Sequence, residues 1–241
     1  MTQIQSQALG YSVDGLAFEG RLLFDAADQA PRPALLMAPN WFGVSEGAQE
    51  IAAQVASRGY RVLLVDLYGA TLRPASPAEA GAAMLPLKQD RSLLRRRLLA
   101  ALDALRGQSV TAIDGTRLAA FGFCFGGTCA LELARAGAPL KAAVSFHGSL
   151  DTPDAADARR IQGAVLVLDG ALDPLVPREQ LPAFAKEMGD AGVDWQLLSY
   201  GGAVHSFTDP DAKVPGTSQY DAKVSRRAFA AMYALLDEVF A

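Results

Sequence analysis

The alternation of short apolar runs with helical segments constrains the fold of this chain more than any other feature of its sequence. From residue 33 onward, continuous apolar runs recur at intervals and are too short for helices. Runs of this kind are typical of strands that are buried on both faces of a parallel sheet. The predicted strands are residues 33–38, 61–67, 117–123, 142–146, 164–169 and 195–200.

Segments with apolar residues at helical spacing separate these runs. Residues 91–105 place Leu94, Leu98, Leu102 and Leu105 on one stripe, which leaves the arginines at 91 and 95–97 mostly on a solvated face. The other predicted helices are 46–58, with Ser45 as N-cap, 128–136, 178–190 and 219–240.

Strand and helix therefore alternate through most of the chain, which predicts an α/β fold. We expect a mostly parallel central sheet with helices on both faces, built as a single domain over residues 1–241. Near-alternation over residues 16–24 indicates one half-exposed strand, and residues 70–90 read as an irregular loop with a short helix.

The composition excludes several classes of protein. With 22 basic against 26 acidic residues, the net charge of −4 argues against a nucleic-acid-binding surface. Two cysteines and two histidines provide neither a disulfide scaffold nor a zinc cluster, so no metal is expected. No apolar run reaches the roughly 20 residues of a membrane helix, and residues 1–15 have no basic region followed by an apolar core, so a secretory signal is not expected. A cytoplasmic protein without a membrane partner is predicted, and its oligomeric state stays open.

The chemistry centres on Cys124. Gly122-Phe-Cys124-Phe-Gly126 follows an apolar strand and leads into a predicted helix. A turn of this kind exposes its central side chain in a strained backbone conformation at a helix N-terminus, where a thiolate is favoured. Cys129 has no such turn around it and is expected to pack in the core, and the spacing of the two cysteines does not fit a redox motif.

An acid and a histidine follow the cysteine in the order that suits a catalytic triad. Asp173 lies in the loop after the strand at 164–169, and Asp169, at the end of that strand, is the rival acid. His205 follows the last predicted strand and completes the order Cys124, Asp173, His205. His147 precedes both acids, so it is expected to be a structural or pocket residue.

Acyl transfer also needs hydrogen-bond donors for the oxyanion. The backbone N–H of Phe125, directly after the cysteine, is one candidate. The N–H of Trp41, in the loop after the strand at 33–38, is the other. Trp41 and Phe42 are expected to form one wall of the pocket, because the net charge disfavours the alternative of stacking on nucleic acid.

Together these motifs resemble the dienelactone hydrolase family of the α/β-hydrolase fold. The resemblance extends from about residue 11 to the end and is carried by residues 39–43, 66–69, 122–127, 170–173 with 176–177, and 205–207. It implies hydrolysis of an ester or lactone through a thioester on Cys124, without a cofactor. Pocket residues expected from it and from the loops are Asn40, Phe42, His147 and Phe207.

Two positions depart from the family pattern. Family members carry a glutamate where this chain has Asn40, which cannot take a proton from the thiol. They also carry an arginine, which binds a substrate carboxylate, where this chain has Asp209. The expected substrate is therefore a small neutral ester or lactone. Alternatives are a thioesterase or acyl transferase with the same triad, a catalytically silent binding protein, and a redox sensor that uses Cys124.

Overall fold

A computed structural model describes residues 2–241 of the chain. Contacts between Cα atoms divide it into two compact units, one up to Ala120 and one from Phe121 onward. Strand β5 (Ile113–Phe123) begins in the first unit and ends in the second. The expectation of a single domain over residues 1–241 stays a prediction.

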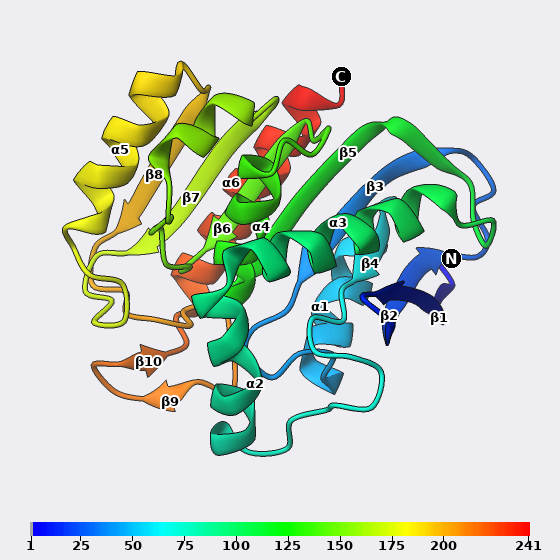
Figure 1. Ribbon diagram of the computed structural model, residues 1–241, viewed down its shortest axis with the longest axis horizontal. Helices are drawn as coiled ribbons and strands as arrows, with labels where there is room; N and C mark the ends of the chain where they lie inside the picture. The colour runs from blue at the N-terminus through cyan, green and yellow to red at the C-terminus, as the bar shows by residue number, and fades with distance from the viewer. Residues whose placement is uncertain (1) are drawn as a thin grey trace. The chain divides into compact units, whose positions relative to one another are not determined.

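The first unit holds strands in the order β1-β2-β4-β3-β5 (Figure 1). They are β1 (Ile4–Val13), β2 (Leu16–Asp25), β3 (Arg32–Ala38) and β4 (Arg61–Leu64). Strands β3 and β4 are parallel, whereas β1 and β2 form an antiparallel hairpin. The hairpin turns at Asp14 and Gly15, whose φ angles of 52° and 80° suit an Asp-Gly hairpin turn. The sequence did not predict β1, because most of its side chains are exposed and no apolar face marks it.

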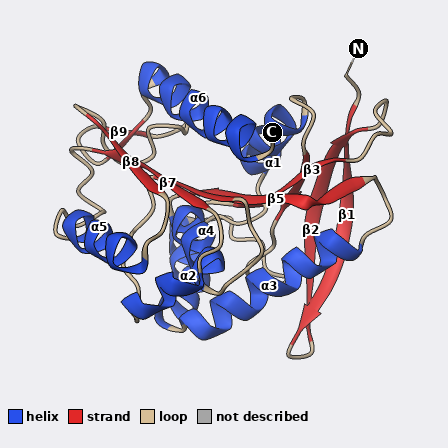
Figure 2. Cartoon of the chain, turned by 90° about the horizontal axis from the view of Figure 1, so that it is seen from above, coloured by secondary structure: helices blue, strands red, loops and turns tan. Residues whose placement is uncertain are grey.

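Helices α1 (Glu46–Ala56) and α3 (Arg91–Gly107) cover opposite faces of the first unit's strands (Figure 2). The predicted cap of α1 is confirmed, because the Ser45 hydroxyl accepts a hydrogen bond from the Ala48 N–H. The predicted leucine stripe of α3 is also confirmed, since all four leucines are buried. The segment at 70–90 is more regular than expected: α2 (Pro77–Gln89) begins after a Ser76 cap and continues to Asp90, which caps α3.

The arginines of α3 do not all lie on a solvated face, which corrects the sequence-based expectation. Arg91 is buried, and Arg97 donates a hydrogen bond to the Leu67 carbonyl while its guanidinium lies 5.1 Å from the centre of the Phe18 ring. Of the arginines at 91 and 95–97, only Arg96 is exposed, with an ion pair to Asp14. Long arginine stems packed along apolar surface produce this burial, which the helical period alone does not reveal.

The second unit continues from the end of β5 with parallel strands in the order β6-β7-β8. These are β6 (Ala142–Phe146), β7 (Ala164–Gly170) and β8 (Trp195–Tyr200). Helices α4 (Phe125–Arg135) and α5 (Gln180–Ala191) lie on one face and α6 (Ala222–Val239) on the other (Figure 2). A 3₁₀ helix, η1 (Ala155–Arg160), and two short strands, β9 (Lys213–Val214) and β10 (Ser218–Gln219), complete the unit.

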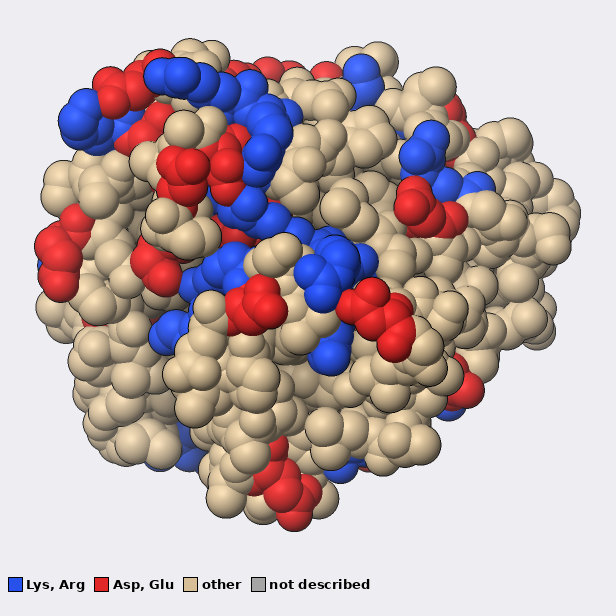
Figure 3. Space-filling model, in the orientation of Figure 1, with Lys and Arg blue, Asp and Glu red and all other residues tan. Residues whose placement is uncertain are grey.

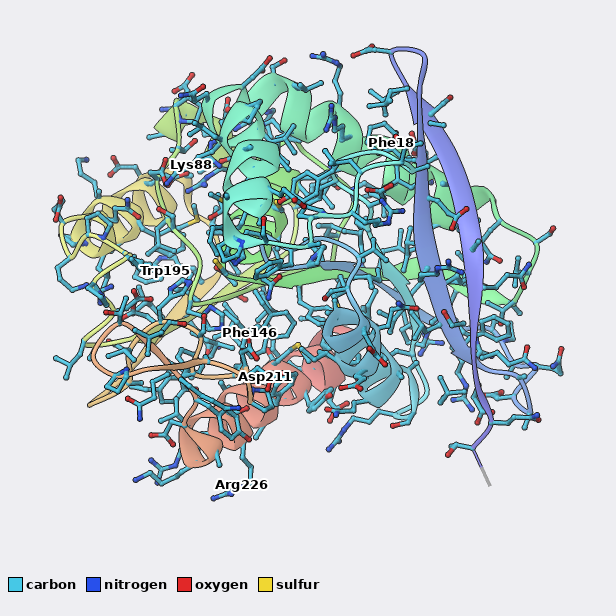
Figure 4. All side chains as sticks on the ribbon, turned by 90° about the horizontal axis from the view of Figure 1, so that it is seen from below. Phe18, Lys88, Phe146, Trp195, Asp211 and Arg226 are labelled. Atoms are coloured by element: carbon cyan, nitrogen blue, oxygen red, sulfur yellow. The ribbon has the colours of Figure 1, made fainter. Side chains whose placement is uncertain are left out.

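One strand of the second unit refines the sequence-based strand predictions. Strand β8 is an edge strand and alternates between half-buried and exposed side chains, rather than being covered on both faces. Strands β6 and β7 are buried throughout, as predicted. Phe146 at the end of β6, labelled in Figure 4, packs toward α6, where its ring centre is 5.1 Å from that of Phe229. The Phe146 carbonyl oxygen also accepts a hydrogen bond from the Cys124 N–H, so the buried end of β6 lies next to Cys124.

Candidate active site

The chain turns sharply at Cys124, between β5 and α4. Cys124 has φ 55° and ψ −119°, a left-handed conformation that non-glycine residues rarely adopt. Its backbone N–H points to two acceptors, the Phe146 carbonyl oxygen at 3.0 Å and Nδ1 of His147 at 3.1 Å. Helix α4 begins at the next residue, so Cys124 lies at a helix N-terminus and its side chain is half-buried.

Glycines allow α4 to approach β6 closely behind the cysteine. A Cβ atom on Gly127 would lie 2.5 Å from Oγ of Ser145, and one on Gly148 would meet the same oxygen at the same distance. Any larger residue at either position would push the helix away from the strand. Ser145 itself is buried, and its hydroxyl has no hydrogen-bond partner within residues 2–241.

Asp173 and His205 form a buried pair in the second unit. Nδ1 of His205 lies 2.7 Å from Oδ2 of Asp173, and both side chains are almost fully buried. The other Asp173 oxygen, Oδ1, accepts a hydrogen bond from the Leu175 N–H. The loops that carry the two residues are in backbone contact, because a Cβ on Gly170 would lie 2.8 Å from the Ala203 carbonyl oxygen.

His205 is held as a cation by its surroundings. Burial alone lowers the pKa of an imidazole, but hydrogen bonding and negative charge from Asp173 and Cys124 outweigh it and raise the pKa of His205 to about 10. Nε2 of His205 is buried and makes no hydrogen bond of good geometry within residues 2–241. The group that it meets is the Cys124 thiol, and such contacts tighten when a substrate binds.

This raised pKa predicts how stability depends on pH. Because the pKa of His205 is higher in the folded than in the unfolded state, its stabilising contribution is fully present below about pH 6.5 and is lost as the pH rises toward about 10. Urea unfolding of the wild type and of Asp173→Asn should show a free-energy difference that shrinks across this range. Parallel pH profiles for the two proteins would contradict the assignment of Asp173 as the cause.

Asp169, the rival acid, is engaged elsewhere. Its carboxylate forms two hydrogen bonds with the Arg178 guanidinium, at 2.9 and 3.1 Å, and a third with the Ser199 hydroxyl at 2.7 Å. Within residues 2–241 it makes no hydrogen bond or ion pair with His205. These bonds anchor the start of the loop that carries Asp173.

His147 has both ring nitrogens engaged. Nδ1 faces the Cys124 N–H, and Nε2 lies 2.8 Å from the Thr208 hydroxyl. Burial, and next the nearby His205, lower the pKa of His147 well below its ordinary value, so its ring is neutral. The rings of His147 and His205 lie 5.0 Å apart, and that of Phe207, which is fully buried, packs edge-on 4.9 Å from His147. A pocket role for His147 and Phe207 stays a prediction.

Asn40, Trp41 and Phe42 belong to the first unit. The Asn40 side-chain oxygen accepts a hydrogen bond from the Phe42 N–H at 3.0 Å, and the rings of Trp41 and Phe42 pack edge-to-face. The Trp41 carbonyl accepts a bond from the Tyr68 hydroxyl at 2.8 Å, and a Cβ on Gly43 would lie 3.1 Å from the Tyr68 ring. Tyr68 therefore supports the loop from which the second oxyanion donor is expected.

Asp209 lies four residues beyond His205, in a turn. Its Oδ1 accepts a hydrogen bond from the Asp211 N–H at 2.9 Å, and its own N–H bonds the Ser206 carbonyl oxygen. The carboxylate thus stabilises the turn and adds negative charge beside the histidine loop.

Within residues 2–241 no group of three or more histidine, cysteine or acidic side chains is arranged to hold a metal ion. No helix of the described chain combines the length and apolarity needed to cross a membrane.

On the face drawn in Figure 3, basic and acidic side chains lie interspersed rather than in a patch of one sign. The absence of a nucleic-acid partner stays a prediction.

Sequence reasoning did not find three residues of this region. Thr208 and Ser145 are ordinary polar residues whose positions follow from tertiary packing alone, so no local signal marks them. Tyr68 lies in the motif at residues 66–69, which carries part of the family resemblance and was the available signal, whereas its hydrogen bond to the Trp41 carbonyl is visible only in the structure.

Comparison with known proteins identifies the family. The model of the dienelactone hydrolase family matches residues 19–240, nearly the whole chain. The chain belongs to the dienelactone hydrolase family. This confirms the resemblance seen in the sequence and identifies the chain as a hydrolase of the ester and lactone class.

Two solved structures are similar over almost their whole length. One is a dienelactone hydrolase-like promiscuous phosphotriesterase from metagenomic libraries, 41% identical with a TM-score of 0.92 and 98% of each chain covered. The other, named m3DLH, is 40% identical with a TM-score of 0.93 and 99% of each chain covered. A relative from Bradyrhizobium, named a probable 2-oxo-3-(5-oxofuran-2-ylidene)propanoate lactonase, is 29% identical over 73% of each chain. The predicted α/β-hydrolase fold is confirmed by these matches.

Proposed function

We propose that this dienelactone hydrolase family member cleaves a small carboxylic ester or lactone through a thioester formed on Cys124. The observation that carries the proposal is the buried His205–Asp173 pair, 2.7 Å apart, whose imidazole meets the thiol at the strand-to-helix turn. A nucleophile, a base and an orienting acid in this arrangement are the requirements of a catalytic triad.

The reaction follows from the charges of the three groups. The Cys124 thiolate attacks the carbonyl carbon, and the tetrahedral oxyanion collapses as the carbon–oxygen bond to the alcohol breaks. The His205 imidazolium gives its proton to the departing alkoxide. Neutral His205 then takes a proton from water, the hydroxide attacks the thioester, and the carboxylic acid leaves as the thiolate is restored. Asp173 accepts a hydrogen bond from the Nδ1 proton of His205, which orients the ring and stabilises the imidazolium.

Backbone donors are proposed to stabilise the oxyanion. Phe125 is the first residue of α4, and the N–H groups of a first helical turn have no acceptor within their own helix. The Trp41 N–H is proposed as the second donor, in the loop that Tyr68 supports.

Thiol activation is proposed to rest on His205 without help from a glutamate. Asn40 occupies the position of the family glutamate, but its amide cannot take a proton from the thiol. Its oxygen already accepts a hydrogen bond from the Phe42 N–H. The raised pKa of His205 favours the imidazolium form, which can stay as the positive partner of the sulfur once the thiol has lost its proton. Asn40 then has a role in holding the loop rather than in proton transfer.

The preferred substrate is proposed to be neutral, because Asp209 places a negative charge where a carboxylate-binding cation would be needed. Asp209→Asn keeps the hydrogen bond to the Asp211 N–H and removes only the charge. We expect kcat/KM for an anionic lactone to rise by about 3- to 10-fold relative to that for a neutral one. Steady-state kinetics on both substrates measures this.

Asp211→Asn is the matched control, because Asp211 is two residues away and almost fully exposed. It should leave the ratio of the two kcat/KM values unchanged. An equal effect of both variants would show that the change is general surface charge, and no effect of Asp209→Asn would overturn the proposed preference.

Trapping the covalent intermediate tests the reaction class directly. The enzyme is mixed with excess ester or lactone, quenched in acid and analysed by mass spectrometry. A lactone should add its whole mass to the Cys124 peptide, because its alcohol stays attached, whereas an ester should add only its acyl group. Cys124→Ala should show no adduct. Hydrolysis by the wild type without any adduct on Cys124, under conditions that trap other thioesters, would contradict the mechanism.

A second candidate activity is hydrolysis of phosphotriesters. The metagenomic relative that is 41% identical over 98% of the chain is named for it. A phosphotriester is also uncharged, which suits the negative charge at Asp209. Adding one to the trapping panel separates the activities, since it would leave a phosphoryl rather than an acyl mass on the enzyme. Thioesters belong in the same panel, because the same residues would cleave them.

A small-molecule substrate is implied by the family, and a cytoplasmic location is proposed on the sequence alone.

A silent binding protein would give neither turnover nor adduct with any member of the panel. A redox sensor would instead show oxidation of Cys124 by peroxide without hydrolysis.

A further inference from the structure

His147 lies at the point where the elements that carry Cys124 and His205 meet. It follows directly after β6, its N–H donates to the Leu168 carbonyl on β7, and its φ of 40° is left-handed. Its side chain is buried. Nothing in the proposed reaction uses it.

The hydrogen bonds of the ring define its tautomer. The Cys124 backbone N–H can only donate, so Nδ1 of His147, 3.1 Å away, is the acceptor and carries no proton. In a neutral ring the proton then lies on Nε2, which donates to the Thr208 hydroxyl at 2.8 Å. Since both nitrogens are occupied, His147 is not available as a general base.

The two hydrogen bonds connect the turn that carries Cys124 with the segment that carries His205. One ends on the backbone of the nucleophile, in a conformation that a cysteine adopts only under constraint. The other ends three residues beyond the catalytic histidine, in the segment whose Phe207 ring also packs against His147. A shift of the ring would therefore move Cys124 relative to His205.

We propose that neutral His147 is a positioning residue, which holds the Cys124 turn and the His205 loop at their reactive separation through Nδ1 and Nε2. This inference rests on the proposed function. It predicts that loss of the ring lowers kcat while KM changes little, because substrate binding does not require the thiol and imidazole to be aligned.

Two replacements at His147 separate the hydrogen bond from the backbone strain. Asparagine and glycine both tolerate a positive φ, but only the asparagine side chain offers an acceptor near the position of Nδ1. We expect His147→Gly to lower kcat by about 100-fold and His147→Asn by about 10-fold or less, with KM within about 3-fold for both. The rate of Cys124 alkylation by iodoacetamide should follow the same order.

Thr208→Val tests the second hydrogen bond while nearly preserving shape. It should lower kcat by about 3- to 10-fold in the wild type and have no further effect in His147→Gly, because the partner is already absent. This variant also keeps the inference testable if His147→Gly does not fold. Nitrogen chemical shifts of the His147 ring should report a neutral ring protonated at Nε2.

Three results would overturn the inference. They are equal kcat losses in His147→Asn and His147→Gly, independent effects of Thr208→Val and His147→Gly, and a proton on Nδ1 of His147. If the wild type hydrolyses no substrate of the trapping panel, the proposed function fails instead, and the ring shifts still test the predicted tautomer.

Discussion

Replacing Cys124 by alanine is expected to lower kcat for ester or lactone hydrolysis by roughly 10⁴- to 10⁶-fold. The whole covalent route depends on this sulfur, and no other group in the described site offers a nucleophile next to His205. The fold should be retained, because the side chain is half-buried and alanine keeps the Cβ atom. Steady-state kinetics, with urea unfolding as the test of folding, measures both effects.

Cys129→Ala is the matched control, since Cys129 lies in the same helix but is fully buried. It should cost about 1–2 kcal/mol of stability through the small cavity and leave kcat within a few-fold of the wild type. If Cys124→Ala instead retained activity within tenfold of the wild type while Cys129→Ala lost it, the nucleophile would be misassigned.

Replacing Asp173 by asparagine is expected to lower kcat by about 10⁴-fold. Oδ1 of Asp173 accepts the Leu175 N–H, so an asparagine that keeps this bond would turn its NH₂ group toward Nδ1 of His205. Nδ1 would then have to accept, and the ring proton would move to Nε2, where it blocks removal of a proton from the thiol or from water. The pKa of His205 should fall, because burial remains while the carboxylate is lost.

Nitrogen and proton NMR of the His205 ring tests this prediction independently of activity. Asp169→Asn is the control: it weakens the ion pair with Arg178 and should reduce stability, but it should leave the titration of His205 unchanged. If Asp169→Asn shifted the His205 titration and Asp173→Asn did not, the acid of the triad would be Asp169.

The buried strands and the main helices could be predicted from the sequence because their signals are local. The leucine stripe of α3 and the Ser45 cap of α1 depend on spacing within one segment, and both are present. Strand β1 has no such local signal, and β8 is more exposed than its apolar residues indicate, because a strand at or near the edge of a sheet has fewer covered faces. The burial of the α3 arginines has no local signal either, since it depends on distant partners such as Leu67 and Phe18.

The sequence by itself determined the class of fold and the family, and it proposed Cys124 and His205 as reacting residues while leaving Asp169 as a rival to Asp173. The fold class follows from the spacing of apolar residues. The family and the reacting residues follow from the order of motifs along the chain and from the glycines that flank Cys124. Only the tertiary structure shows the partners of the two acids: Asp173, in the loop after β7, meets His205, whereas Asp169, within β7, pairs with Arg178. It also gave His147 its hydrogen-bond partners at Cys124 and Thr208, which lie 23 and 61 positions away in the chain. Contacts between residues so far apart arise from packing, and no local pattern encodes them.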